Sequence, residues 1–243
     1  MIPWVHLDTA KVPGTAKDEL RLMQRGSEFA IFAGPTPLMN SRMSSSEIIL
    51  AQIACARLAG RSNVHMLIGG YGMGFTLRAA LAGLGKDARV TIAELVPAVL
   101  AWARGPMSEL TSGCLDDPRV GVREDDVGAA IASAHAAYDA ILLDVDNGPD
   151  GLSRAANDWL YDARGLEAAR KALRPGGLLA VWSAAPNKDF VFRLGRAGFA
   201  VEEVKARANK GKGVRHIIWV ASNPARQASA STGPSSKAIR SPK

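Results

Sequence analysis

The hydrophobic positions of this chain follow two alternating periods from residue 64 onward. Short apolar runs with the length of strands alternate with longer segments that have the helical period of about 3.6 residues. Strands are expected over 64–69, 89–95, 119–124, 138–145, 177–184, 199–206 and 215–221, with helices over 74–84, 96–104, 126–136, 157–173 and 187–197. This order predicts an α/β fold with a doubly wound, mostly parallel seven-stranded sheet, the Rossmann-like methyltransferase fold.

The last two expected strands differ from the others in their connection. Only a short loop rich in Gly and Lys separates 199–206 from 215–221, and no crossover helix fits into it. A parallel pair needs a crossover of a dozen or more residues, so these two strands are expected to pair antiparallel.

The N-terminal part predicts a small β-hairpin followed by a loop and a helix. Residues 19–25 and 28–34 have the character of strands, and the two-residue link Gly26-Ser27 is typical of a hairpin. The Pro and Gly content of GPTPLMNSR (34–42) predicts a loop. Ser44 and Glu47 have the S-x-x-E spacing of a capping box, which favours a helix over 45–59. The alternative is that these serines contact a substrate.

Charge and composition divide the chain into three parts. Residues 223–243 hold four basic and no acidic residues and are rich in Ser, Ala and Pro, which predicts a disordered basic tail. Residues 1–43 are expected to be the hairpin extension and 44–222 the catalytic domain. Without the tail the net charge falls from +7 to +3, so a nucleic-acid partner is not expected. The basic cluster at 205–215 is interpreted as a solvated hairpin tip, with a patch for an anionic substrate or RNA as the alternative.

Neither a membrane segment nor a signal peptide is expected from the sequence. No apolar run reaches the roughly 18 residues that span a bilayer, and the first residues lack a charged and then an apolar region. The two cysteines, Cys55 and Cys114, suggest no disulfide framework. These features favour a cytoplasmic protein.

A glycine loop is the strongest signal for a ligand. Gly70, Gly72 and Gly74 follow G-x-G-x-G between an expected strand and an expected helix, where backbone amides can approach a nucleotide. Phe75 stands where the dinucleotide fingerprint has its third glycine, and no Gly-Lys-Ser/Thr follows. The loop therefore disfavours NAD and excludes a Walker loop. Close helix–strand packing alone is the alternative explanation.

Acidic residues follow the next two strands. Glu94 lies 20 residues after Gly74, where a carboxylate can accept from both ribose hydroxyls. Asp125 and Asp126 follow the third strand; Asp125 is the favoured partner of an adenine amino group. Either aspartate can instead cap the helix 126–136, and the two roles are compatible.

A second group of polar residues follows the fourth strand. Asp144, Asp146 and Asn147 crowd the loop that begins there, and ligands of doubly wound sheets bind beyond such strand ends. Clustered carboxylates suit a cationic amine and can take its proton. A divalent metal and a plain turn are the alternatives, and no metal is assigned. Trp159 and Tyr161, further along, either wall an acceptor pocket or belong to the core.

In their order and spacing these segments resemble the spermidine synthase family, polyamine aminopropyltransferases with a class I methyltransferase-like fold. The resemblance covers about residues 19–222 and rests on the hairpin, GGYGMGFTLRAAL, AELVPAVLAWAR, DDPRVGVREDDV and YDAILLDVDNGP. It implies that Glu94 holds the ribose and Asp125 the adenine of the donor. It implies that Asp144 orients and deprotonates a small amine acceptor, that Glu47 helps to bind this amine, and that the protein forms a homodimer.

The chain departs from the family pattern at three positions. Gly72 stands where the family has an acid that binds the amine of decarboxylated S-adenosylmethionine, Ser45-Ser46-Glu47 replaces a Tyr-His-Glu-like segment, and Asn147 replaces the second acid of D-x-x-D. Aminopropyl transfer to a small amine is the leading function. A methyltransferase and a non-catalytic nucleotide-binding protein are the alternatives. Since Gly72 removes a repulsive charge, intact S-adenosylmethionine is expected to bind at least as well as the decarboxylated donor.

Overall fold

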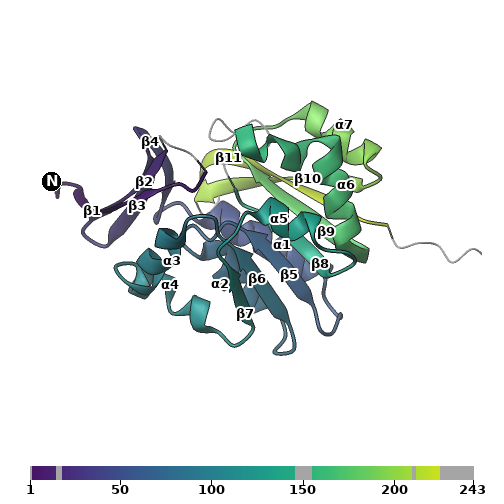
Figure 1. Cartoon of the computed structure of the whole chain (residues 1–243), viewed down its shortest axis with the longest axis horizontal. Coiled ribbons are helices and arrows are strands. Elements are labelled where there is room, and N and C mark those ends of the chain that lie inside the picture. The colour runs from purple at the N-terminus through teal and green to yellow at the C-terminus, as the bar shows by residue number, and fades with distance from the viewer. Residues whose placement is uncertain (1, 15–17, 146–154, 210–211, 225–243) are drawn as a thin grey trace, which may run out of the picture.

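The structure is a computed structural model that describes residues 2–14, 18–145, 155–209 and 212–224. These residues form two separate β-sheets, and helices cover both faces of the larger one (Figure 1). In the described part of the chain, no helix is long and apolar enough to cross a membrane.

Seven strands make up the larger sheet. Their order is β10 (Ala200–Asn209), β11 (Lys212–Ser222), β9 (Leu173–Ser183), β8 (Tyr138–Leu143), β5 (His65–Gly69), β6 (Arg89–Ala93) and β7 (Val120–Arg123). The pairs from β9 to β7 are parallel, whereas β11 is antiparallel to both of its neighbours. The expected seven-stranded, doubly wound sheet and the antiparallel final pair are thus confirmed.

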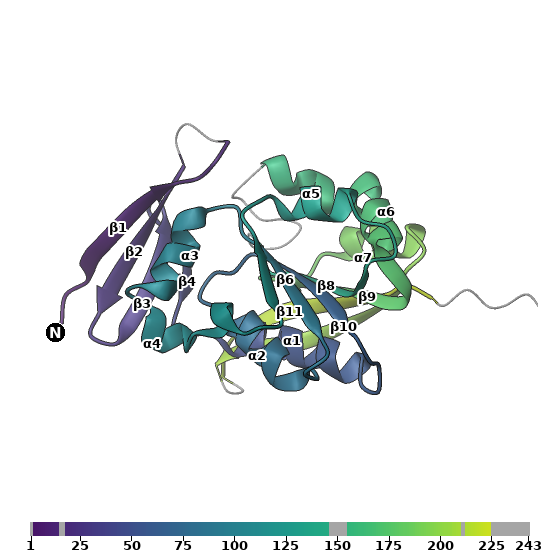
Figure 2. The ribbon, with the colours of Figure 1, turned by 60° about the horizontal axis from the view of Figure 1, so that its bottom comes forward.

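Helices form one layer on each face of this sheet (Figure 2). The first layer holds α1 (Ser45–Arg57), α2 (Phe75–Gly83) and α3 (Pro97–Arg104), followed by the short α4 (Ser108–Thr111) and η1 (Cys114–Asp116). The second layer holds α5 (Val127–Ala132), η2 (Ala155–Tyr161), α6 (Ala163–Ala172) and α7 (Lys188–Arg196).

Two hydrophobic cores result from the alternation of side chains along each central strand. In β8, Ala140 and Leu142 belong to the core under the first layer, while Ile141 and Leu143 belong to the core under the second. Successive side chains of a strand point to opposite faces, so a strand covered on both sides must be apolar throughout. This is why β8 appears in the sequence as an unbroken apolar run from Ala140 to Leu143.

The N-terminal sheet is larger than the expected hairpin. The expected pair β2 (Glu19–Arg25) and β3 (Glu28–Ala33) is present, with β1 (Val5–Lys11) added beside β2 and β4 (Thr36–Asn40) beside β3, all antiparallel. The expected loop over 34–42 is therefore wrong for β4. Pro37 is tolerated because β4 is an edge strand, where a missing N–H need not break the ladder.

The N-terminal sheet shares the first core with the larger domain. Leu22 and Ile31 are buried in that core together with Leu100 of α3. Trp102 of α3 donates its indole N–H to Asp8 Oδ2 of β1 at 2.7 Å. The sheet is thereby held beside α3 (Figure 2), and β4 comes to lie next to the glycine loop.

The expected capping box at the start of α1 is wrong, although the helix begins where it was expected. Ser44 is the N-cap residue, but its side chain makes no capping hydrogen bond, and only its carbonyl accepts from Ile48 N at 3.1 Å. Glu47 accepts instead from the Ser46 hydroxyl. Its side chain lines a cavity and does not cap the helix.

Candidate active site

A cavity of about 660 Å³ lies where the direction of chain progression through the larger sheet reverses. From β5 the chain proceeds to β6 and β7, then returns to β8 on the other side of β5. The ends of β5 and β8 stay close there, since Asp144 N donates to Gly69 O at 3.3 Å. This switch point is the usual ligand site of doubly wound sheets. Residues of β2, β3 and β4 in the N-terminal sheet complete the cavity wall.

The glycine loop lies between β5 and α2 and contributes to the cavity wall. Gly70, Gly72 and Gly74 have φ values of 81°, 55° and 76°, in the left-handed region that favours glycine. A Cβ at Gly70 would lie 2.9 Å from the Asp144 carbonyl oxygen, and one at Gly72 would lie 3.0 Å from Met39 Sδ. Gly70 and Gly72 both line the cavity, so the absence of side chains lets a ligand approach the backbone.

Glu94 follows β6 directly, and backbone amides hold its carboxylate, one of them from the glycine loop. Its Oε2 accepts from Tyr71 N at 2.8 Å and its Oε1 from Val96 N at 2.9 Å, and only 7% of the residue is exposed. Burial raises the pKa of Glu94, while these backbone amides act in the opposite direction. A carboxylate has about four acceptor positions, and the Tyr71 and Val96 amides occupy one on each oxygen. The ribose role of Glu94 stays a prediction.

The two aspartates after β7 have different environments. Asp126 Oδ1 accepts from Gly128 N at 2.6 Å, which makes Asp126 the N-cap of α5, and the residue lines the cavity. Asp125 accepts from Asp126 N at 2.8 Å and forms an ion pair with Arg123 at 3.1 Å. The capping role that was left open therefore belongs to Asp126. The adenine role of Asp125 stays a prediction.

Asp144 follows β8 and faces the cavity with a perturbed carboxyl group. Thr76 of α2 donates its hydroxyl to Asp144 Oδ2 at 2.9 Å. Burial and then the negative charge of Glu47 raise the pKa of Asp144 to about 7, against the lowering effect of the Thr76 hydrogen bond. A base is most effective when its pKa lies near the working pH, and Asp144 meets this condition at neutral pH.

Glu47 reaches the same cavity from the first turn of α1. It is 8% exposed, and its Oε2 accepts from the Ser46 hydroxyl at 2.9 Å. Burial raises the pKa of Glu47 as well. Glu47 and Asp144 lie close enough for the charge of Glu47 to act on the Asp144 carboxyl. The substrate-binding role of Glu47 stays a prediction.

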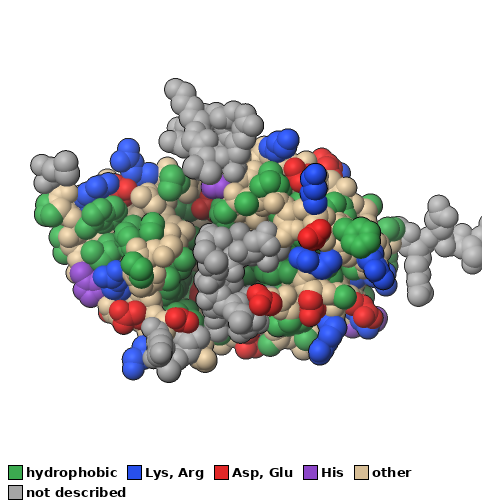
Figure 3. All heavy atoms as spheres, turned by 90° about the horizontal axis from the view of Figure 1, so that it is seen from above, with side chains coloured by type: hydrophobic (Ala, Val, Ile, Leu, Met, Phe, Trp, Pro, Cys, Tyr) green, Lys and Arg blue, Asp and Glu red, His purple; other side chains and the backbone are tan. Residues whose placement is uncertain are grey.

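The charges that line the cavity have one sign. The acidic side chains among the lining residues are Asp18, Glu19, Glu47, Glu94, Asp126 and Asp144. Among the described side chains of the lining there is no Lys or Arg. The molecule as a whole is basic, so this concentration of carboxylates favours a cationic ligand. On the face that Figure 3 shows, blue Lys and Arg side chains are scattered rather than gathered into one basic patch.

Several expected site residues lie elsewhere or outside the described residues. Asp146 and Asn147 are outside the described part of the chain. Tyr161 is 4% exposed and packs edge-on against Phe190 in the second core, with ring centroids 5.7 Å apart. Trp159 packs against the same core, and neither aromatic residue lines the cavity. Tyr161 thus belongs to the core, which was one of the two alternatives, and the half-buried Trp159 packs against it.

Other residues of the site had little or no signal in the sequence. The only sequence feature that pointed to Thr76 was its place two residues after Gly74. The structure places its polar side chain on the buried face of α2. His216 and Met39 had none, since the first is an isolated histidine on a strand and the second lies in a segment expected to be a loop. Both line the cavity because distant segments meet there.

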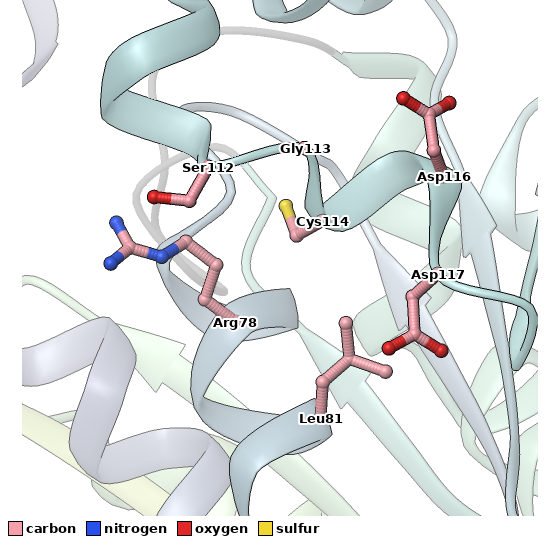
Figure 4. Close-up of a pocket in the computed structure, with 7 residues that line it drawn as sticks. All are labelled: Arg78, Leu81, Ser112, Gly113, Cys114, Asp116 and Asp117. Carbon is pink, nitrogen blue, oxygen red and sulfur yellow. The ribbon is translucent and has the colours of Figure 1, made fainter.

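A second hollow lies between α2 and the segment 112–117 that contains η1 (Figure 4). It has about 380 Å³, and Arg78, Ser112 and Asp117 are among the residues around it. It has no lining residue in common with the larger cavity. Within the described ranges, no group of three or more His, Cys, Asp or Glu residues is arranged to hold a metal ion.

The electrostatic coupling in the cavity can be tested directly. Asp144 is expected to titrate near pH 7, protonated below this value and ionised above it. Glu47→Gln removes the neighbouring negative charge and should lower this pKa, whereas Thr76→Val removes a hydrogen bond to the carboxylate and should raise it. Carbon NMR titration of the labelled aspartate carboxyl measures both shifts. Glu109→Gln, on α4 away from the cavity, serves as control; shifts of the same sign in both test variants would contradict the assignment.

Comparison with known proteins confirms the expected resemblance to the spermidine synthase family. No family model matches the chain. It is 34% identical over 149 residues to a polyamine aminopropyltransferase of Mycobacterium tuberculosis, which covers 56% of this chain but 27% of that protein. The chain thus matches only about a quarter of that relative's length.

Solved structures show the same fold. Spermidine synthase from Thermotoga maritima superposes with a TM-score of 0.71 at 16% identity, over 90% of this chain and 72% of the other. A spermidine synthase in complex with the transition-state analogue AdoDATO gives 0.69 at 15% identity, with the same coverage.

Proposed function

We propose, from this similarity and from the acidic cavity, that the chain transfers an aminopropyl group from decarboxylated S-adenosylmethionine to a small amine. The observation that carries the proposal is Asp144, a cavity carboxylate with a pKa of about 7 beside a second carboxylate. A base of this kind can take a proton from an ammonium group at neutral pH. The acidic lining suits both the sulfonium of the donor and the charged nitrogens of an amine.

The residues divide into a donor side and an acceptor side. Glu94 binds the ribose hydroxyls and Asp125 the adenine amino group, while Gly70 and Gly72 let the backbone approach the nucleoside. Asp144 orients the acceptor nitrogen and accepts its proton, and Glu47 stabilises the positive charge of the acceptor. Asp126 fixes the start of α5 beside the adenine site, because its side chain caps the helix by accepting from Gly128 N.

The reaction is a substitution at the carbon bound to sulfur. The lone pair of the deprotonated amine forms the new C–N bond as the C–S bond breaks, and sulfur leaves as a neutral thioether. The proton released by the amine goes to the Asp144 carboxylate. Since the sulfonium supplies the leaving group, the protein contributes positioning and one proton transfer.

The charge of the cavity favours the decarboxylated donor over intact S-adenosylmethionine, which revises the expectation from Gly72. The position beside Gly72 is occupied by the apolar Met39, and no described Lys or Arg in the lining offers a partner for a carboxylate. A donor carboxylate would therefore meet only like charges. The same argument disfavours a methyltransferase that uses the intact donor.

Calorimetric titration tests the donor preference. Decarboxylated S-adenosylmethionine is expected to bind at least about tenfold more tightly than the intact form, because like charges at close range in a partly buried site cost more than about 1.4 kcal/mol. Methylthioadenosine, which lacks both the carboxylate and the ammonium, is the control for nucleoside binding. Equal affinity for the two donors would contradict the preference and support the methyltransferase alternative.

Mass spectrometry of the products decides the transferred group. After incubation of the protein with each donor and a panel of diamines and polyamines, we expect an acceptor heavier by one aminopropyl unit. A gain of one methyl group would establish the methyltransferase instead. No product with any pair, despite donor binding, would support a non-catalytic nucleotide-binding protein.

The compartment and the oligomeric state stay predictions. Cys55 and Cys114 are free thiols, which suits the reducing cytoplasm that we propose as the location. The homodimer rests on the family resemblance, and light scattering during size-exclusion chromatography measures it.

A further inference from the structure

Three cavity residues form a chain of hydrogen bonds between α1 and β11. His216 Nδ1 lies 3.0 Å from Ser46 Oγ, and Ser46 Oγ donates to Glu47 Oε2 at 2.9 Å. All three residues line the cavity. His216 and Ser46 are 170 positions apart in the sequence, so the fold alone brings them together.

The protons available in this series of hydrogen bonds determine the tautomer of His216. A carboxylate can only accept hydrogen bonds, so Glu47 next to a bound cation requires the single hydroxyl proton of Ser46. Ser46 Oγ is then left as an acceptor, and His216 Nδ1 must carry a proton. Burial lowers the pKa of His216, which favours the neutral ring. A neutral ring with a proton on Nδ1 has an unprotonated Nε2, which is a hydrogen-bond acceptor.

The ring is also held by an aromatic neighbour. Trp182 of β9 contacts His216 edge-on, with the ring centroids 4.7 Å apart and an interplanar angle of 65°. Together with the Ser46 bond, this contact limits rotation of the imidazole. Among the described residues, Nε2 has no hydrogen-bond partner of its own, and the residue borders the cavity.

We propose that His216 is a specificity-determining residue for the acceptor, whose Nε2 accepts a hydrogen bond from an N–H group of the amine while Glu47 stabilises its positive charge. This inference rests on the proposed function and extends it to a residue outside the sequence expectations. The Ser46 hydroxyl links the two groups and thereby couples the charge of Glu47 to the tautomer of the histidine.

Two substitutions at position 216 separate the hydrogen bond from the packing. His216→Phe keeps a ring against Trp182 but removes the acceptor, and we expect KM for the amine to rise about 10- to 100-fold, since a hydrogen bond to a charged group contributes roughly 1.5–3 kcal/mol. The value of kcat and the affinity for the donor should change less than about threefold. His216→Gln offers a carbonyl oxygen near the position of Nε2 and should restore most of the loss.

The control is His135→Phe, a substitution at an exposed histidine that does not line the cavity. Unchanged KM in His216→Phe would overturn the inference. Equal impairment of His216→Gln and His216→Phe would also overturn it, since packing alone would then explain the effect. Donor affinity verifies that each variant is folded.

Nitrogen NMR of the histidine ring tests the inference without turnover. In the protein bound to methylthioadenosine and a diamine, which supplies the cation beside Glu47, His216 is expected in the Nδ1–H tautomer, and Ser46→Ala should release it toward the Nε2–H form. A wild-type ring with its proton on Nε2 would overturn the inference even if aminopropyl transfer is observed. Conversely, absence of transfer to any amine would refute the proposed function, whatever the tautomer.

Discussion

Replacing Asp144 with asparagine is expected to lower kcat/KM for aminopropyl transfer by about 10³-fold, within the range of 10²–10⁴ typical for loss of a general base. Asparagine has nearly the same shape and can still accept from the Thr76 hydroxyl, but it cannot take a proton from the amine. Donor affinity should change little, since the nucleoside side of the cavity is untouched. Steady-state kinetics with the decarboxylated donor, together with calorimetry, measures both quantities.

The loss should not come from unfolding. Because the pKa of Asp144 is raised from 3.8 to about 7 in the folded protein, the free energy of unfolding falls as the pH rises between these two values and stays lower above about pH 7. Asparagine resembles the protonated form, so the variant should melt at the same or a higher temperature at pH 8. Asp116→Asn, at an exposed acid beside the hollow of Figure 4, is the matched control. Turnover within about threefold of wild type in Asp144→Asn would exclude a base role for this residue.

The second large effect is expected at Glu94. Glu94→Gln should weaken donor binding by about 100-fold, because hydrogen bonds to a charged group contribute roughly 1.5–3 kcal/mol and two ribose hydroxyls are involved. The amide NH₂ would also face the N–H of Tyr71 or Val96, which now donate to the carboxylate. This mismatch should lower the free energy of unfolding by about 1–3 kcal/mol.

Both parts of this result can be measured on the same protein. Calorimetry with methylthioadenosine reports nucleoside binding, and urea unfolding reports stability. Glu203→Gln, at an exposed position of β10, is the control. If Glu94→Gln lost stability but bound the nucleoside as tightly as wild type, Glu94 would be a structural support of the glycine loop and not the ribose ligand.

The core positions and the strand ends could be predicted from the sequence because their signals are local. The apolar run Ala140–Leu143 of β8 ends at Leu143, and the position of Asp144 at the edge of the sheet follows from that boundary alone. The glycines at 70 and 72 were expected to bring the backbone to a ligand, and both line the cavity. Repeated strand–helix units also determined the doubly wound order, since parallel strands require crossovers.

The sequence-based expectations that were wrong have a shared cause, namely contacts between segments that are distant in the sequence. β4 contains a proline and lacks a strand pattern, and it exists because β3 offers it an edge to pair with. Glu47 had the correct spacing for a capping box, but the hydroxyl of Ser46 and the cavity compete for its carboxylate. Local propensity therefore decided where α1 begins, while tertiary contacts decided what its first turn binds.

The sequence by itself determined the order of the elements, the faces that are buried and the edge at which polar residues collect, because these depend on periodicity and chain connectivity. Only the tertiary structure decided the chemistry of that edge. The raised pKa of Asp144 requires burial and the charge of Glu47 from α1, and the hydroxyl of Thr76 from α2 acts in the opposite direction. The link between His216 and Glu47 likewise requires β11 to meet α1. Electrostatic effects depend on distance in space and on solvent exclusion, and neither quantity is encoded in local sequence patterns.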